Sequence, residues 1–430
     1  MKRYPEYKES GVEWIGEIPA HWKIKKIKHI ATLVSEKSTP ETGTIKISPE
    51  NVESKTGKVL DFYSSYDSSG VKFQVGDVLF NKIRVYLNKV VFAEYDGYSL
   101  GEMIVMRPSL QGVGKYLFYF MLSSRFIEYC DSISYGAKMP RTAVDDILNA
   151  QIPITSDKEQ TQIANFLDQR TGKIDELIHI KERQIELFHE QRTALINQVV
   201  TKGLEPNVEM KPSDVEWIEE IPAHWEVLKV KHVGLSNPSK NNSKTTCFKD
   251  SLVVFLPMER VHTDGTIDQE LRLPYSQLKS GYTYFEEGDI LIAKVTPCFE
   301  NGKIVHIKNL ATSVGFGSTE FIVIRPDLQK VFPPFLYYVL RNDPLRGIGK
   351  HYMTSAVGLK RVPTEFVENF RIPIPTYHEQ TQIANFLDGK TKQIDELIAT
   401  EQRKIELLKE YRQSLISEAV TGKIDVRNEV

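Results

Sequence analysis

The sequence repeats itself, and this repeat constrains the fold more than any other feature. Residues 159–168 read EQTQIANFLD, and residues 379–388 read the same ten letters. Over 159–203 and 379–423 the two copies share 26 of 45 residues at a constant offset of 220. A repeat of this length indicates that one structural unit occurs twice along the chain.

A second matched pair precedes each copy. VEWIGEIPAHWKIKKIKHI at 12–30 matches VEWIEEIPAHWEVLKVKHV at 215–233 at 13 of 19 positions with an offset of 203, and all four tryptophans lie in it. Because the offset rises from 203 to 220, the second copy has gained 17 residues between the matched ends. We interpret each copy as a variable globular module framed by near-constant ends. The predicted modules are 1–155 and 206–375, and the predicted helical spacer regions are 156–205 and 376–430.

Within each module the sequence predicts a small sheet with few helices. Short apolar and β-branched runs, such as MIVMRP at 103–108, are separated by turn signals such as Gly76-Asp77. One helix is expected late in each module, over 117–123 and 335–341, because these matched runs lack the alternation of a strand. The predicted fold class is therefore α+β, with two β-rich globular domains.

Beyond the modules the apolar spacing becomes that of a long helix. A seam runs at alternating steps of four and three from Ile174, with a break expected at Gly172, and six of its eight positions are apolar. The matched seam in the second copy begins at Ile394. The predicted helix–helix spacer residues are Ile174, Ile178, Ile185, Phe188 and Leu195 in the first copy and Ile394, Ile398, Ile405, Leu408 and Leu415 in the second.

Each seam is the obvious partner of the other. We expect a long antiparallel two-helix coiled coil, about 40 Å over the seam, which separates the two modules and gives the chain a pseudo-twofold internal repeat. In this arrangement Arg192 would face Glu401, and Lys181 would lie near Arg412, which is an unfavourable match. The competing interpretation is that each apolar stripe packs on its own module.

The amino-acid composition excludes only a few classes of function. Lys plus Arg total 55 and Asp plus Glu total 57, and a local basic face can be hidden in this net charge of -2. The mean hydropathy of -0.32 and the lack of a long apolar run predict a soluble, cytoplasmic chain with no membrane partner. Cys130, Cys247 and Cys298 lack the spacing of a zinc site, and no nucleotide loop or catalytic motif occurs. We therefore expect no metal, no cofactor and no catalytic residues.

Basic side chains occupy related places in both modules. Lys and Arg on loops around a rigid sheet can contact phosphates for affinity and guanine edges for sequence. For any one lysine a solvated surface is the competing interpretation, whereas Arg141 and Arg361 align at the offset of 220 and are stronger candidates. His21 and His224 are expected to be hydrogen-bonded turn residues. The candidate DNA-binding residues are Lys82, Arg84, Lys89, Lys138 and Arg141 in the first module and Lys294, Lys303, Lys360 and Arg361 in the second.

The combination of these motifs resembles the specificity subunit of type I restriction-modification systems. The motifs are the IPAHW segment, the Gly-Asp turn, the Glu before an apolar run ending in Arg-Pro, and EQTQIANFLD before a long helix, and each occurs twice. The resemblance implies that each module is a target recognition domain that reads one half of a bipartite DNA site. It also implies that the helices set the gap between the half-sites and dock two methyltransferase subunits, with restriction subunits in the full complex.

The resemblance further implies that this chain is not catalytic and that its partners carry out adenine N6 methylation and ATP-dependent cleavage. Two diverged modules imply an asymmetric target. One alternative that the neutral charge leaves open is a protein–protein scaffold without DNA binding. A second alternative is that this chain is the recognition part of a system whose enzyme is a separate, fused chain.

Overall fold

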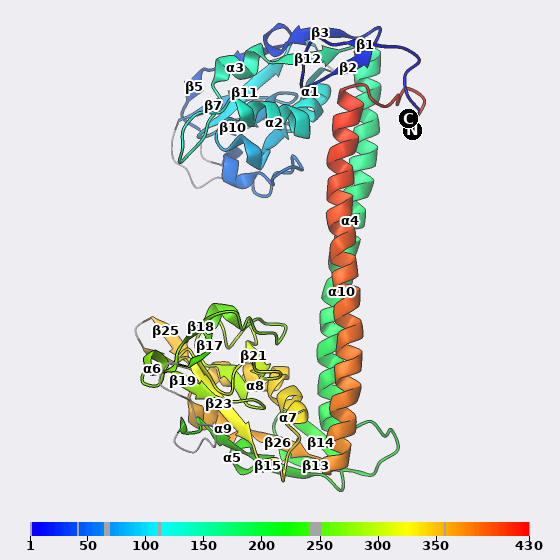
Figure 1. The fold of residues 1–430 in the computed structure, drawn as a ribbon. Coiled ribbons are helices and arrows are strands. Elements are labelled where there is room, and N and C mark those ends of the chain that lie inside the picture. The colour runs from blue at the N-terminus through cyan, green and yellow to red at the C-terminus, as the bar shows by residue number, and fades with distance from the viewer. Residues whose placement is uncertain are drawn as a thin grey trace. The chain divides into compact units, whose positions relative to one another are not determined.

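The computed structural model describes residues 2–40, 43–63, 69–110, 113–240, 251–356 and 358–429. The chain forms two compact units, each of which combines a globular module with part of both long helices (Figure 1). Unit 1 consists of Met1–Arg183 and Glu401–Val430, and unit 2 consists of Gln184–Thr400. Cys247 lies outside the described residues. No helix in the described parts of the chain is long and apolar enough to cross a membrane.

Two four-stranded sheets form the framework of the module in unit 1. One has the antiparallel order β4-β11-β8-β9, and the other has the order β5-β7-β10-β6 with a single parallel pair, β10 and β6. β8 is buried along its whole length, which explains its continuous apolar run. The strands are β1 (Tyr7–Glu9), β2 (Glu17–Pro19), β3 (Lys23–Lys26), β4 (Ala31–Val34), β5 (Lys37–Ser38), β6 (Lys46–Ile47), β7 (Gly70–Phe73), β8 (Val78–Asn81), β9 (Val90–Phe92), β10 (Gly97–Ser99), β11 (Met103–Pro108) and β12 (Gln151–Ile154), and the helices are α1 (Val113–Leu122), α2 (Ser124–Ser132), α3 (Val144–Asn149) and the 3-10 turns η1 (Ile27–His29), η2 (Pro49–Asn51) and η3 (Val85–Leu87).

Unit 2 repeats this plan with the sheets β16-β23-β20-β21 and β18-β17-β22-β19, and again one pair, β17 and β22, is parallel. The helices predicted near 117–123 and 335–341 are confirmed as α1 and α7. The strands are β13 (Met210–Val215), β14 (Ile218–Pro222), β15 (Glu226–Lys229), β16 (Gly234–Ser236), β17 (Leu252–Leu256), β18 (Arg272–Pro274), β19 (Thr283–Phe285), β20 (Ile290–Ala293), β21 (Ile304–His306), β22 (Gly315–Gly317), β23 (Phe321–Pro326), β24 (Thr354–Ala356), β25 (Leu359–Arg361) and β26 (Arg371–Ile374), and the helices are α5 (Val230–Val233), α6 (Tyr275–Leu278), α7 (Pro333–Arg341), α8 (Asp343–Tyr352), α9 (Thr364–Asn369) and the 3-10 turn η5 (Met258–Arg260).

The near-constant ends close each module on itself. β3 pairs with β12 in unit 1, and β15 pairs with β26 in unit 2, so the strand after the Ile-Pro-Ala-His turn lies beside the last strand of its module. Trp22 and Trp225 follow the Ile-Pro-Ala-His turns and are fully buried in the main core of their unit. Burial of a tryptophan removes a large apolar area from water, which explains why this end of the module varies so little between the copies.

The two long helices are α4 (Asp157–Lys202) and α10 (Tyr377–Val420). The break predicted at Gly172 is wrong, because α4 continues through this residue. Gly172 is exposed, and a glycine in a helix costs only about 1 kcal/mol. Packing of Ile174, which is buried one half-turn later, offsets that cost.

The two helices pair antiparallel in both units, with the ten predicted spacer residues buried or half-buried. The predicted register is wrong. Arg192 contacts Asp395 at 3.1 Å, not Glu401, and Arg412 contacts Asp175 at 3.1 Å, not Lys181. Each arginine thus pairs with a carboxylate six residues before the residue we predicted, and this shift avoids the repulsion between Lys181 and Arg412.

The competing interpretation of the stripes is also correct in part. In unit 1, Ile174 and Leu415 join the main core of the module, and in unit 2 Ile196 and Val199 do the same. The helix pair and the module of each unit therefore share one hydrophobic core, which fixes the module against its own stretch of the helices.

Candidate nucleic-acid interface

In unit 1 a basic loop lies against the end of β8. The amide of Thr142 donates to the carbonyl of Lys82 at 2.9 Å, and the amide of Arg84 donates to the carbonyl of Pro140 at 2.7 Å. Ile83 and Arg141 form a β-bridge between these hydrogen bonds. The structure thus brings together predicted residues that are nearly 60 positions apart in the sequence.

Unit 2 builds the same arrangement on the end of β20. The amide of Val362 donates to the carbonyl of Lys294, and the amide of Thr296 donates to that of Lys360, both at 2.9 Å. Val295 and Arg361 form the equivalent bridge. Here Arg361 lies in β25, which pairs antiparallel with β24. Two modules with diverged sequences therefore hold a basic segment at the same place.

The side chains at this place differ between the units. In unit 1, Lys82 forms an ion pair with Glu102 at 3.0 Å. In unit 2, Arg361 binds Glu320 through Nη2 at 2.7 Å and Nε at 2.9 Å. The hydrogen bond from Arg361 lowers the pKa of Glu320, and the carboxylate in turn raises the pKa of Arg361.

Three other candidates in unit 1 are unengaged. Within the described parts of the chain, the side chains of Arg84, Lys138 and Arg141 have no hydrogen-bond or ion-pair partner. Arg84 and Lys138 are exposed. Arg84 also adopts a left-handed backbone with φ of 47°, which is uncommon for a residue with a side chain. The loop contact at Pro140 holds it in this conformation.

Lys89 and Lys303 have a different environment from the other candidates. The Nζ of Lys89 donates to the carbonyl of Pro49 at 2.6 Å, and the Nζ of Lys303 donates to that of Met258 at 2.9 Å. These carbonyls belong to η2 and η5, which are equivalent turns in the two modules. The contacts therefore support a role in holding these turns against the sheet.

Two ion pairs that involve buried aspartates explain motifs whose role the sequence did not reveal. Arg107 binds Asp77 through two hydrogen bonds of 3.0 and 2.8 Å, and Arg325 binds Asp289 at 2.8 and 2.7 Å. Both aspartates are 1% exposed. Burial raises the pKa of Asp289, and Arg325 opposes this effect. The matched Gly-Asp and Arg-Pro segments were the signal that could have identified these pairs.

The first turn of each long helix binds the start of its own module. Glu159 accepts hydrogen bonds from Tyr4 at 2.8 Å and from Trp22 at 3.2 Å, and lies 2.9 Å from His21. Glu379 accepts from Trp225 at 3.1 Å and lies 2.9 Å from His224. The prediction that the two histidines are hydrogen-bonded turn residues is confirmed. In each copy, hydrogen bonds therefore join the EQTQIANFLD segment to the IPAHW segment.

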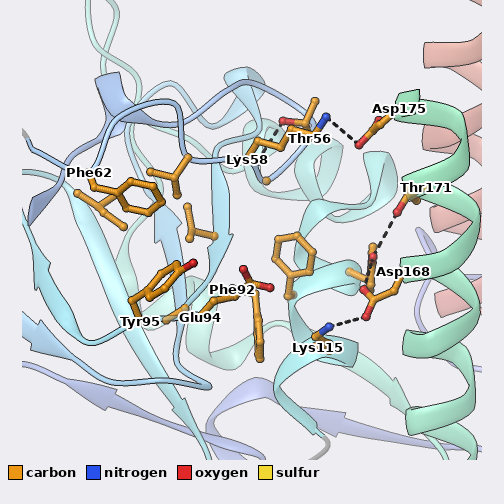
Figure 2. A pocket seen from close by; sticks show the side chains of 18 of the residues that line it. Thr56, Lys58, Phe62, Phe92, Glu94, Tyr95, Lys115, Asp168, Thr171 and Asp175 are labelled. Carbon is orange, nitrogen blue, oxygen red and sulfur yellow. Dashed lines mark hydrogen bonds and ion pairs between the residues drawn. The ribbon is translucent and has the colours of Figure 1, made fainter. Parts of the chain in front are cut away.

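A cavity of about 520 Å³ lies between the module and the helices in unit 1 (Figure 2). Lys58 contacts Asp175 at 3.1 Å, and Lys115 forms an ion pair with Asp168. The guanidinium of Arg412 donates to the carbonyls of Lys55 at 2.9 Å and Thr56 at 3.0 Å. The contacts of Lys58 and Arg412 fasten the loop around Thr56 to the helices, and that of Lys115 fastens α1 to α4. No cluster of three or more metal-ligating side chains occurs in the described parts of the chain.

Comparison with known proteins adds independent information. The family model for the type I restriction modification DNA specificity domain matches residues 19–187 and again 222–410. The EcoEI specificity subunit of Escherichia coli is 33% identical over 195 residues, which is 45% of this chain and 32% of that protein. The chain thus matches about a third of the length of this relative. The MjaIX specificity subunit of Methanocaldococcus jannaschii is 24% identical over 98% of this chain and 97% of its own.

Solved structures share the fold. A structure described as the basis of complex assembly and conformational transition of the type I R-M system superimposes with a TM-score of 0.70 at 16% identity, covering 95% of this chain and 99% of that one. The HsdS subunit from Thermoanaerobacter tengcongensis gives a TM-score of 0.52 at 18% identity, covering 95% and 98%. Because the family model matches both modules and most of the chain, this protein belongs to the family of type I restriction-modification specificity subunits.

Proposed function

We propose that each unit reads one half of an asymmetric bipartite DNA site. The observation that carries this proposal is the basic segment that both modules hold beside the end of β8 or β20. The backbone arrangement is the same, but Lys82-Ile83-Arg84 in unit 1 stands where unit 2 has Lys294-Val295-Thr296. A common framework with different side chains suits two readers of different sequences.

The helix pair is proposed to set the gap between the half-sites. α4 and α10 each run without a break across the boundary between the units, at Arg183 and at Thr400. Insertion of four residues after Glu182 together with four after Thr400 adds about 6 Å of helix. The unread gap should then lengthen by about one to two base pairs, given about 3.4 Å for each base pair. An unchanged gap would count against this role.

The flanks of the helices are proposed to dock two methyltransferase subunits. Leu177 and Leu407 in unit 1 are 46% and 48% exposed, and their counterparts Leu397 and Leu187 in unit 2 are both 47% exposed. Each unit thus offers an equivalent pair of exposed leucines. Large exposed apolar side chains repeated in two copies favour a partner that binds twice. Changing Leu177 and Leu407 to serine should remove one methyltransferase subunit from the purified complex.

Adenine N6 methylation and ATP-dependent cleavage are proposed to belong to the partner subunits, with restriction subunits joining the full complex. The test is coexpression with methyltransferase subunits, copurification, and mapping of methylated adenines in the host DNA. We expect a stable complex and methylation at a split, non-palindromic sequence that requires this chain. A chain that fails to copurify, or methylation that does not depend on it, would favour the scaffold alternative.

A further inference from the structure

A glutamate borders the basic segment in both units. Glu102 precedes β11, and Glu320 precedes β23. The amide of Lys82 donates to the carbonyl of Glu102 at 3.3 Å, and the amide of Lys294 donates to that of Glu320 at 2.8 Å. The backbone therefore places the two glutamates equivalently, each beside the lysine that follows the neighbouring strand, β8 or β20.

The two carboxylates nevertheless bind different cations. Glu102 pairs with the lysine, Lys82, at 3.0 Å. Glu320 pairs with the arginine, Arg361, although Lys294 also contributes to the lowered pKa of Glu320. The same acidic position thus selects a different basic side chain in each unit.

The choice matters because arginine and lysine present their charge differently. A carboxylate that accepts from both Nε and Nη2 fixes the plane of a guanidinium, whereas an ammonium remains a point charge that can rotate. A guanidinium has five N–H donors, so a carboxylate on one edge does not exhaust them. Arginine in a fixed plane is the side chain that can donate to both O6 and N7 of guanine.

The arginines of the same strands already have carboxylate partners of their own. Arg107 and Arg325, at the other ends of β11 and β23, already bind the buried Asp77 and Asp289. Asp77 and Asp289 are 1% exposed, whereas the side chains of Glu102 and Glu320 are 38% and 26% exposed, and that of Arg361 is 33% exposed. A half-buried pair is partly screened by water and contributes less to folding than a buried one, and a role in presenting the cation accounts for a glutamate at both equivalent positions.

We propose that Glu320 is a positioning residue that fixes Arg361 for a bidentate contact with a guanine in the half-site read by unit 2. Glu102 holds Lys82, which gives unit 1 a cation without a fixed plane. This inference rests on the proposed function and adds to it the base that unit 2 recognises. It predicts that the two half-sites differ in how strictly they require guanine at the equivalent position.

The experiment uses the full chain coexpressed with methyltransferase subunits, and maps methylated adenines for the wild type and for E320Q, E320D, R361K and E102Q. Exchange of residues 31–155 identifies the half-site that unit 1 reads, and hence the one that unit 2 reads. In E320Q and R361K, preference for one guanine in the unit 2 half-site should fall about 5- to 100-fold. E320D should retain part of it. E102Q, the matched control, should leave the unit 2 half-site unchanged.

Affinity for unrelated duplex DNA gives a second readout. E320Q removes a negative charge, so nonspecific binding should stay constant or increase while specificity falls. A unit 2 half-site without guanine, or an E320Q half-site identical to that of the wild type, would overturn the inference. So would a uniform loss of affinity in R361K without a change in base preference, because this would make Arg361 a phosphate contact. A wild-type complex without sequence-specific methylation would instead refute the proposed function itself.

Discussion

Lys181 and Glu401 occupy the same position in the two copies of the repeat, 220 residues apart, and their side chains form an ion pair of 3.0 Å. When two copies of one helix pair antiparallel, one position of the first copy must lie opposite the same position of the second copy. Identical charged residues at this position would repel each other. Lys181 and Glu401 carry opposite charges, which favour pairing of the first copy with the second. Hydrogen bonds from Lys404 and Lys181 lower the pKa of Glu401.

Charge reversal tests this pairing. The E401K variant places a second lysine against Lys181, and K181E places two glutamates together, so each should lower the melting temperature by a few degrees. The double variant K181E/E401K restores opposite charges and should recover most of the loss. Thermal unfolding measures all three. As a control, Arg403→Glu changes an exposed pair with Glu406 on the same helix and should have little effect; equal losses in every variant would argue against a specific pair.

Acid should weaken the anchor between Glu379 and the start of its module. Burial alone would raise the pKa of Glu379, but hydrogen bonds from Thr376, His224 and Trp225 outweigh it and hold the pKa at about 2, below the usual 4.5. Because the folded pKa is depressed, the stabilisation is complete above about pH 4.5 and is lost as the pH falls toward 2.

The variant E379Q should therefore lose about 1–2 kcal/mol at pH 7, after allowance for solvent screening. Its stability should also change less between pH 5 and pH 3 than that of the wild type. Denaturant unfolding at several pH values measures both effects. An E379Q variant with the acid sensitivity of the wild type would show that another carboxylate is responsible.

Removal of the buried charge in unit 2 should destabilise that unit. Asp289→Asn removes the charge that Arg325 binds at 2.7 Å, although Arg325 keeps its ion pair with Glu286 at 3.0 Å, so the expected loss is about 1–3 kcal/mol. Limited proteolysis should then cut within 206–375 sooner than in the wild type. The matched variant D77N should expose 1–155 instead. The prediction is wrong if both variants are cut in the same module.

Lysines with different surroundings should differ in the salt dependence of DNA binding. Lys138 is exposed, so K138A should reduce the slope of log affinity against log salt by about 1 if it contacts a phosphate. Lys303 binds the carbonyl of Met258, so K303M should leave this slope unchanged. Titrations of the complex with a nonspecific duplex at four salt concentrations would measure the slopes. A reduced slope in K303M would return that residue to the DNA-binding set.

The repeat predicted much of the fold because it supplies long-range information that local patterns lack. The two β-rich modules, the helices near 117–123 and 335–341 and the antiparallel helix pair all followed from matched segments. The register of the helix pair did not follow from the sequence. The seam alone does not show that the long side chains of Arg192 and Arg412 reach aspartates beside the seam. The helix break predicted at Gly172 is wrong because the helix propensity of one residue is small compared with the packing energy of a long helix.

The candidate interface was predicted only in outline. The sequence identified Arg141 and Arg361 by their alignment, and the structure places them beside the ends of equivalent strands, β8 in unit 1 and β20 in unit 2. The sequence did not indicate that Glu320 binds Arg361 while Glu102 binds Lys82, because these pairs join segments that meet only after folding. The contacts of Lys89 and Lys303 with backbone carbonyls were hidden for the same reason.

Module exchange tests the central claim most directly. Residues 31–155 are replaced by the same region of a relative with a different target, and methylated adenines are mapped in cells that also make the methyltransferase subunits. The account predicts that one half of the methylated sequence changes while the other half and the gap stay the same. A change in both halves, or in neither, would contradict independent reading by the two units.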